Sequence, residues 1–130
     1  MSIQLNHTIV SARDPQASAA FLARLLGRAA PVRFGPFHDV ELDNGVTLDF
    51  MQEDGEIVRQ HYAFLVSEQE FDDVFGRIQA RGFAYWADPG HTKAGKINRN
   101  EGGRGVYWRD PDGHNLEILT RPYGSGSVDT

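Results

Sequence analysis

Hydrophobic residues recur at helical spacing in two segments of the chain. Each set places its apolar side chains three or four positions apart, as on one face of an amphipathic helix. The first set comprises Phe21, Leu22, Leu25 and Leu26, and the second comprises Phe71, Val74, Phe75 and Ile78. The pattern therefore predicts two helices, each with one apolar face that covers a sheet.

Capping residues mark the ends of both predicted helices. Asp14 is a good N-cap, Pro15 suits the first helical position, and Gly27 is a C-terminal stop. Ser67 and Glu70 are three residues apart and can form a reciprocal capping box at the start of the second helix. The sequence thus predicts helices that begin after residues 14 and 67.

Alternating positions predict strands and show which side chains share a face. Successive side chains of a strand point to opposite sides of the sheet. In the strands 46–51, 61–66 and 115–119, the alternate positions that are mostly apolar are assigned to the helix-covered face. Asp49, His61 and Glu117 then lie on the opposite face. In the run LNHTIV, both faces carry apolar residues, so the orientation of His7 stays open.

Shorter connecting strands are expected over 32–34, 37–42, 83–86 and 104–109. Turns rich in Asp, Asn, Pro and Gly are predicted at 43–45 and 110–113. The predicted element order is βαβββ, twice, which is an α+β fold.

The two halves agree closely in spacing. His7 lies fourteen residues before Phe21, and His61 lies fourteen residues before Phe75. Each half then leads to a carboxylate on a late strand, 42 residues after His7 for Asp49 and 56 residues after His61 for Glu117. These agreements indicate an internal duplication, and the surplus of fourteen residues fits an inserted loop over 87–105.

Length and composition favour a single domain. The chain has 130 residues, of which 40% are hydrophobic. This suffices for one hydrophobic core, whereas each half alone would be too small to bury its sheet well. We expect one domain over 1–130, with module 1 at about 3–53, module 2 at about 58–121 and a flexible tail over 122–130.

Several classes of function are disfavoured by composition. The absence of cysteine excludes disulfides and thiolate metal sites. A net charge of −5 without a basic cluster argues against nucleic acid as a partner. The chain has no run of 18 apolar residues, and MSIQLNH does not look like a leader. We therefore expect a cytoplasmic protein that meets no membrane and binds a small molecule.

The runs LNHTIV, QHYAFLV and YWRDPDGHNLEIL, in the paired βαβββ order, resemble the vicinal oxygen chelate superfamily. That superfamily includes glyoxalase I, fosfomycin-resistance thiol transferases, extradiol dioxygenases and bleomycin-binding proteins. The resemblance implies a curved mixed sheet around a metal cleft, with ligands on the first strand of each module and on the last strand of the second. The matching residues here are His7, His61 and Glu117.

Two imidazoles and a carboxylate suit one divalent Fe, Mn, Ni or Zn ion and leave positions open for substrate. The resemblance implies a further functional position on the last strand of module 1, which Asp49 occupies. Three roles remain open for Asp49: direct ligation, ligation through water, and proton transfer beside the metal. A capped or solvated aspartate is the structural alternative. Asp49 and Glu117 are the predicted catalytic carboxylates.

Substrate contacts are predicted in and around the long loop. The loop carries Lys93, Lys96, Arg99 and Arg104, which would suit a mobile lid over an anionic substrate, although a solvated surface loop is the alternative. Tyr107 and Trp86 match aromatic active-site residues of the fosfomycin enzymes, and ordinary packing is their alternative. His38, His91 and His114 are interpreted as non-ligands.

Among enzyme functions, the carboxylate Asp49 favours a glyoxalase-like isomerase or lyase. A metal-free protein that sequesters a small molecule or antibiotic, of the bleomycin-resistance type, is the alternative. An extradiol-type dioxygenase or a thiol transferase is a further one. Ile9 and Ala87 stand where the fosfomycin enzymes have threonine and lysine, which argues against fosfomycin transfer. Resemblance also implies a homodimer.

Overall fold

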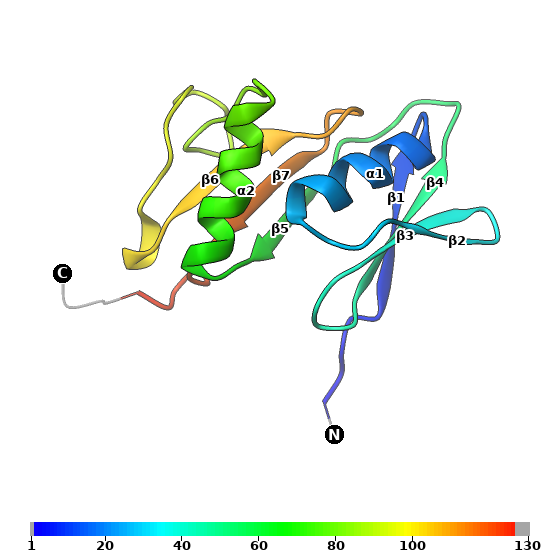
Figure 1. Ribbon diagram of the computed structural model, residues 1–130, viewed down its shortest axis with the longest axis horizontal. Helices are drawn as coiled ribbons and strands as arrows, with labels where there is room; N and C mark the ends of the chain where they lie inside the picture. Colours follow the sequence, from blue (N-terminus) through cyan, green and yellow to red (C-terminus); the bar gives the residue numbers. More distant parts are fainter. Residues whose placement is uncertain (1, 127–130) are drawn as a thin grey trace. The chain divides into compact units, whose positions relative to one another are not determined.

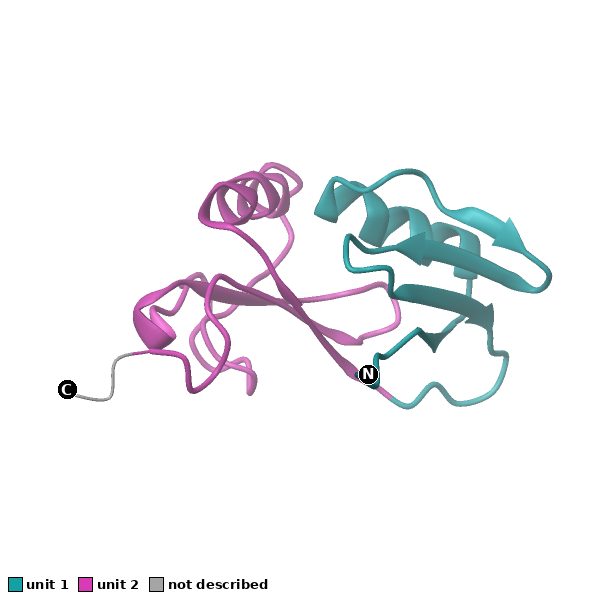
Figure 2. Cartoon of the chain, turned by 90° about the horizontal axis from the view of Figure 1, so that it is seen from below, with its two compact units in different colours: residues 1–58 teal, residues 59–130 magenta. Residues whose placement is uncertain are grey.

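The computed structural model describes residues 2–126, and the chain divides into two compact units, Met1–Val58 and Arg59–Thr130 (Figure 2). The boundary falls between the two predicted modules. Each unit combines one α-helix with one sheet that contains both parallel and antiparallel pairs (Figure 1). The predicted α+β class with mixed sheets is therefore confirmed.

Unit 1 has the predicted βαβββ order. Its elements are β1 (His7–Ala12), α1 (Pro15–Leu26), β2 (Val32–Phe34), β3 (Phe37–Glu41) and β4 (Thr47–Gln52). The sheet order is β1-β4-β3-β2, in which β1 and β4 are parallel and the other pairs are antiparallel. The last strand of the unit thus lies beside the first.

Helix α1 is framed as its sequence predicts. The side chain of Asp14 accepts a hydrogen bond from the Ala17 amide, and Gly27 ends the helix with φ of 69°, in the left-handed region that glycine favours. Leu22 and Leu25 are buried beneath the helix, which packs on the sheet of its own unit. The helix therefore covers one face of that sheet.

Unit 2 repeats this plan with one strand fewer. Its elements are β5 (His61–Leu65), α2 (Glu68–Ala80), the 3₁₀ helix η1 (Asn100–Gly102), β6 (Gly105–Arg109) and β7 (Asn115–Leu119). The sheet order is β5-β7-β6, with β5 parallel to β7. The capping box between Ser67 and Glu70 is present at the start of α2.

The strand predicted over 83–86 does not form. Trp86 exchanges two backbone hydrogen bonds with Tyr107, but the pairing ends there as an isolated bridge. The chain turns immediately afterwards, because the Asp88 carboxylate accepts hydrogen bonds from the amides of Thr92 and Lys93. A local turn thus replaces the continuation of the sheet ladder.

Strand alternation separates a covered face from an open face in both units. Buried residues on the covered faces include Val10, Leu48 and Phe50 in unit 1, and Phe64, Trp108, Leu116 and Ile118 in unit 2. The polar candidates lie at the intervening positions, on the open faces. No helix within residues 2–126 has the length and apolar character needed to cross a bilayer.

Candidate functional site

Strand register places the two candidate carboxylates at equivalent positions. In unit 1, His7 pairs with Thr47 and Ile9 pairs with Asp49 along the parallel strands β1 and β4. In unit 2, His61 pairs with Asn115 and Ala63 pairs with Glu117 along β5 and β7. Each carboxylate therefore lies one alternation beyond the histidine of its unit and on the same face. The predicted repeat extends to individual side chains.

Glu117 is the centre of a polar chain in unit 2. Its side chain is only 1% exposed, and its Oε1 lies 3.0 Å from His61 Nε2. Its Oε2 accepts a hydrogen bond from the hydroxyl of Tyr123. The Tyr123 oxygen lies 2.9 Å from the hydroxyl of Tyr107, which is the cross-strand neighbour of Glu117. Both carboxylate oxygens are thus engaged.

The direction of this chain follows from its acceptor end. A carboxylate can only accept, so Tyr123 donates to Glu117 and Tyr107 donates to Tyr123. Burial raises the pKa of Tyr107 above its ordinary value, and the bond to Tyr123 raises it further. Burial also raises the pKa of Tyr123, followed by its bond to Glu117. Both phenols therefore remain protonated donors at neutral pH.

The equivalent face of unit 1 has a different arrangement. His7 is exposed, and its Nδ1 lies 2.6 Å from Asn6 Oδ1. Asp49 is buried and accepts a hydrogen bond of 2.8 Å from Thr47 Oγ1. Its cross-strand neighbour is Asp39, another acid. Asp49 thus meets a carboxyl group where Glu117 meets a tyrosine.

The pKa of the Asp39 carboxyl is raised above its ordinary value. Burial raises its pKa, and the nearby charge of Asp49 raises it further. Asp39 Oδ1 is buried and makes no hydrogen bond among the described residues. The unit 1 face therefore holds an acid pair beside the first strand.

Trp86 forms a stacked aromatic pair beside the unit 2 network. The rings of Trp86 and His91 are parallel, with centroids 3.9 Å apart. His91 Nε2 lies 2.8 Å from Asn115 Oδ1, and the His91 backbone has φ of 58°, which is uncommon for a residue other than glycine. The loop histidine is therefore held in place by side-chain contacts and at some backbone cost.

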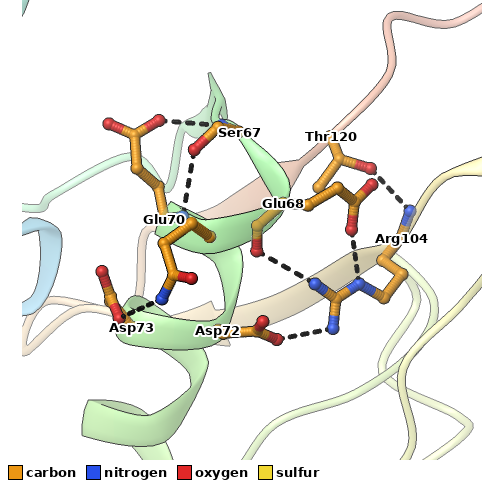
Figure 3. Close-up of polar contacts among 8 residues, drawn as sticks. Ser67, Glu68, Glu70, Asp72, Asp73, Arg104 and Thr120 are labelled. Carbon is orange, nitrogen blue, oxygen red and sulfur yellow. Dashed lines mark hydrogen bonds and ion pairs between the residues drawn. The ribbon is translucent and has the colours of Figure 1, made fainter.

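The predicted cations of the long loop have different surroundings. Arg104 Nε and Nη1 lie 2.8 Å from Glu68 Oε1 and from Asp72 Oδ1, both on α2 (Figure 3). The Arg104 guanidinium also lies over the ring of Phe71. Its charge is thus engaged by α2, which argues against the predicted contact with an anionic substrate. Lys93, Lys96 and Arg99 are exposed.

The loop itself is ordered by local hydrogen bonds. Asp88 accepts from the Thr92 hydroxyl and from two amides, and these bonds lower its pKa to about 2. Asn98 Nδ2 donates to the Ala87 carbonyl, and the backbones of Asn98 and Gly105 form a bridge. The surface loop that was predicted as a possible lid is therefore a hydrogen-bonded element.

His114 lies on the covered face. It is fully buried, and its Nδ1 accepts a hydrogen bond from the Gln60 amide. Its amide in turn is bound by Asp110. These contacts give it a structural role, in keeping with its interpretation as a non-ligand.

The donors of unit 2 fit a divalent metal. Two ligand atoms bound at right angles to one ion, each at about 2.0–2.2 Å, are about 3 Å apart. His61 Nε2 and Glu117 Oε1 have this separation. Neither unit alone assembles three or more His, Asp or Glu side chains for a metal within residues 2–126. The third predicted ligand, His7, belongs to unit 1.

Three residues of the site were not predicted from the sequence. Tyr123 falls in the predicted tail, Asp39 in a short connecting strand, and His91 in the loop. The pairing of Asp39 with Asp49 follows only once the register between β3 and β4 is known. Tyr123 reaches Glu117 after the chain leaves β7, where strand alternation no longer gives a direction.

The chain is similar to a known protein family and to several of its members. Residues 4–118 match the family model described as the Glyoxalase/Bleomycin resistance protein/Dioxygenase superfamily. The chain is 31% identical over 120 residues to glutathione transferase FosA of Serratia marcescens, which covers 88% of this chain and 78% of that protein.

Two solved structures are more similar in sequence. The protein named oxidase ChaP-H1 is 64% identical, with a TM-score of 0.93 over 95% of this chain and 99% of that one. Oxidase ChaP-H2 is 61% identical, with a TM-score of 0.95 over 98% and 100%. The chain therefore shares its fold with both proteins over nearly its whole length.

Proposed function

Because the chain belongs to the glyoxalase/bleomycin resistance protein/dioxygenase superfamily, we propose that it is a metal-dependent oxidase. The observation that carries this is the identity of 61–64% to two proteins named oxidases over 95% or more of the chain. The proposed substrate is a small molecule that presents two neighbouring oxygens to the metal. Because of this identity to two oxidases, the proposal replaces isomerase chemistry as the leading function.

We assign the metal to His7, His61 and Glu117. Fe, Mn, Ni and Zn are all compatible with this donor set, and an oxidase favours a redox-active ion. Such an ion, when bound, polarises a chelated oxygen-bearing substrate and supports electron transfer from it to dioxygen. Glu117 contributes a carboxylate that is buried and already oriented by Tyr123, and His61 supplies a nitrogen at ligand spacing.

Other residues of the unit 2 face would orient the substrate. Trp86 and His91 are stacked face to face, and a planar molecule can extend this stack on an outer ring face. The exposed guanidinium of Arg109 lies 5.9 Å from the Trp86 ring and offers a positive charge beside it. Tyr107 is buried and acts through Tyr123, so we assign it to positioning.

Thiol transfer is disfavoured despite the similarity to FosA. Ala87 occupies the position of a lysine in the fosfomycin enzymes and is buried, and Ile9 replaces a threonine on the open face of unit 1. A glyoxalase-like isomerase or lyase remains the second candidate, because Asp49 lies on the open face at the position equivalent to Glu117. It would serve as the proton acceptor in that chemistry.

Metal analysis tests the proposal. Purified without chelator, or after dialysis against Fe(II) under anaerobic conditions, the chain should bind one ion, and His7→Ala and His61→Ala should each lose it. His38→Ala is the matched control and should bind normally. 4-Nitrocatechol serves as a chelating probe whose visible spectrum should shift on the Fe(II)-loaded protein. Absence of metal would favour the metal-free binding protein instead, and retention of metal by both ligand variants would refute the assignment of His7 and His61 as ligands.

Activity separates the two enzyme candidates. An oxidase consumes dioxygen when a substrate with two neighbouring oxygens is supplied, whereas an isomerase converts the hemithioacetal of glutathione and methylglyoxal without using dioxygen. Dioxygen consumption that requires metal and His61 supports the first. Isomerisation that is abolished by Asp49→Asn supports the second.

We further propose that the working form is a homodimer that binds no nucleic acid and acts in the cytoplasm. His7 and the pair of His61 and Glu117 belong to different units. A second copy could therefore supply the missing ligand. Mixing His7→Ala with Glu117→Gln chains should restore part of the metal binding if ligands are exchanged between copies, and should restore none if each chain completes its own site.

A further inference from the structure

The segment after β7 brings a tyrosine back onto the buried carboxylate. Tyr123 is 59% exposed overall, yet its hydroxyl reaches Glu117, which is 1% exposed. Much of the residue thus faces solvent while its polar end enters the site. An exposed aromatic residue in a C-terminal segment is held in this way only if the segment itself is fixed.

Hydrogen bonds at both ends fix residues 120–126, which we call the strap. At its start, the Thr120 amide donates to the Arg104 carbonyl at 2.9 Å, and Thr120 Oγ1 accepts from the Arg104 amide at 2.8 Å. At its end, the Gly126 amide donates to Glu101 Oε1 at 2.8 Å. Arg121 Nη2 also donates to the Ser125 carbonyl at 2.7 Å and closes the strap on itself.

Two glycines allow the strap to approach η1 closely. A Cβ at Gly103 would lie 2.4 Å from Thr120 Oγ1, and one at Gly126 would lie 2.6 Å from the Cα of Glu101. Such distances are far shorter than van der Waals contact, so only glycine permits this packing. Glu101 itself has φ of 60°, in the left-handed region. The packing of the strap beside η1 therefore depends on these two glycines.

We propose that the strap makes Tyr123 a positioning residue for the carboxylate ligand Glu117. The hydroxyl of Tyr123 donates a hydrogen bond to Glu117 Oε2, while Glu117 Oε1 faces His61. This leaves one defined oxygen for the metal and fixes the carboxylate rotamer. Tyr107 supports the arrangement by donating to the Tyr123 oxygen. The inference rests on the proposed metal site and adds a residue outside the ligand set.

Metal affinity is the direct test. Tyr123→Phe removes only the hydroxyl, and partners that orient metal ligands typically contribute 10- to 100-fold in affinity, so Mn(II) should bind about tenfold or more weakly in a calorimetric titration. Tyr85→Phe is the matched control, because among residues 2–126 the Tyr85 hydroxyl makes only a long hydrogen bond of 3.4 Å, with Gln79. The control should bind like the wild type.

A second variant moves the strap without touching the tyrosine. Gly126→Ala forces the strap off Glu101 and should weaken Mn(II) binding in the same direction. Co(II) loading adds a spectroscopic readout, because a freed Glu117 carboxylate changes the visible absorption of the bound ion. Circular dichroism should show that both variants are folded.

The outcomes separate this inference from the proposed function. If the wild-type chain binds Mn(II), and Tyr123→Phe binds it with the same affinity and gives the same Co(II) spectrum, the strap inference alone is overturned. Wild-type chain that binds no divalent metal overturns the proposed function and this inference with it. Weakened binding in Tyr123→Phe and Gly126→Ala, with Tyr85→Phe unchanged, supports both.

Discussion

The open faces of the two units share a register but not a chemistry. Glu117 and Asp49 occupy equivalent positions beside their parallel first strands. The residue across the antiparallel neighbour is Tyr107 for Glu117 and Asp39 for Asp49. One carboxylate is therefore served by a chain of donors, whereas the other faces a second acid.

This difference shows how two units built on one plan come to differ in their chemistry. Duplication fixes where a side chain emerges from the sheet, but its cross-strand neighbour decides what that side chain can do. In unit 2, Tyr107 and Tyr123 direct donors toward the carboxylate. In unit 1, the cross-strand neighbour Asp39 adds negative charge beside Asp49, and the donor to Asp49 is Thr47 on the same strand.

The largest effect on stability is expected in unit 1. Like charges directly opposite in a sheet are destabilising. Asp39→Asn should therefore raise the free energy of unfolding at pH 7, by a few tenths to about 1 kcal/mol on the scale of cross-strand pairs. Urea denaturation at pH 7 and at about pH 4 measures it.

The pH dependence gives this prediction its sign. Because the folded protein raises the pKa of Asp39, its contribution is most favourable below the unfolded pKa and is lost as pH rises through the folded pKa. The advantage of Asp39→Asn should thus shrink toward acid pH. Asp54→Asn, at an exposed aspartate of unit 1, is the control. An advantage that is absent at pH 7, or equal at both pH values, contradicts the account.

A smaller and more local effect is expected in the loop that only unit 2 carries. Asp88→Ala removes the acceptor for three hydrogen bonds from Thr92 and Lys93. Amide hydrogen exchange of these residues should accelerate, while the amides of β6 and β7 stay protected. Trp86 emission should also change as the stacked His91 gains freedom.

Acid titration of the wild type checks the same contacts. The pKa of Asp88 is lowered to about 2 in the fold, so its bonds should persist above the unfolded value and fail as pH falls toward 2. Asp73→Asn, which alters an exposed acid of α2, is the control. Unchanged exchange at Thr92 in Asp88→Ala would show that the loop is held by other contacts.

Much of the fold could be predicted because its signals are local. Asp14, Pro15 and Gly27 specify the ends of α1, and Ser67 with Glu70 specifies the start of α2. The prediction of a strand over 83–86 was wrong. The residue pattern there fits a strand, but the turn at Asp88 that interrupts the ladder depends on side-chain geometry. The spacing of apolar residues indicates which side chains are buried, but it does not indicate where the backbone pairing of two strands ends.

The candidate site was less accessible to prediction. Alternation correctly placed Asp49, His61 and Glu117 on the open faces, because it needs only the period of a strand. Arg104 was assigned to a substrate by its charge, yet Glu68 and Asp72 engage it. Tyr123 could not be found, since no periodic signal connects the strap to a carboxylate six residues earlier.

The central claim is that the unit 2 carboxylate is a metal ligand and its unit 1 equivalent is not. One comparison tests it most directly: Mn(II) titration of Glu117→Gln and Asp49→Asn under identical conditions. We predict that Glu117→Gln loses more affinity than the roughly 10- to 100-fold typical of residues that only orient a ligand, whereas Asp49→Asn stays within about threefold of the wild type. A large loss in Asp49→Asn with little loss in Glu117→Gln would contradict the account.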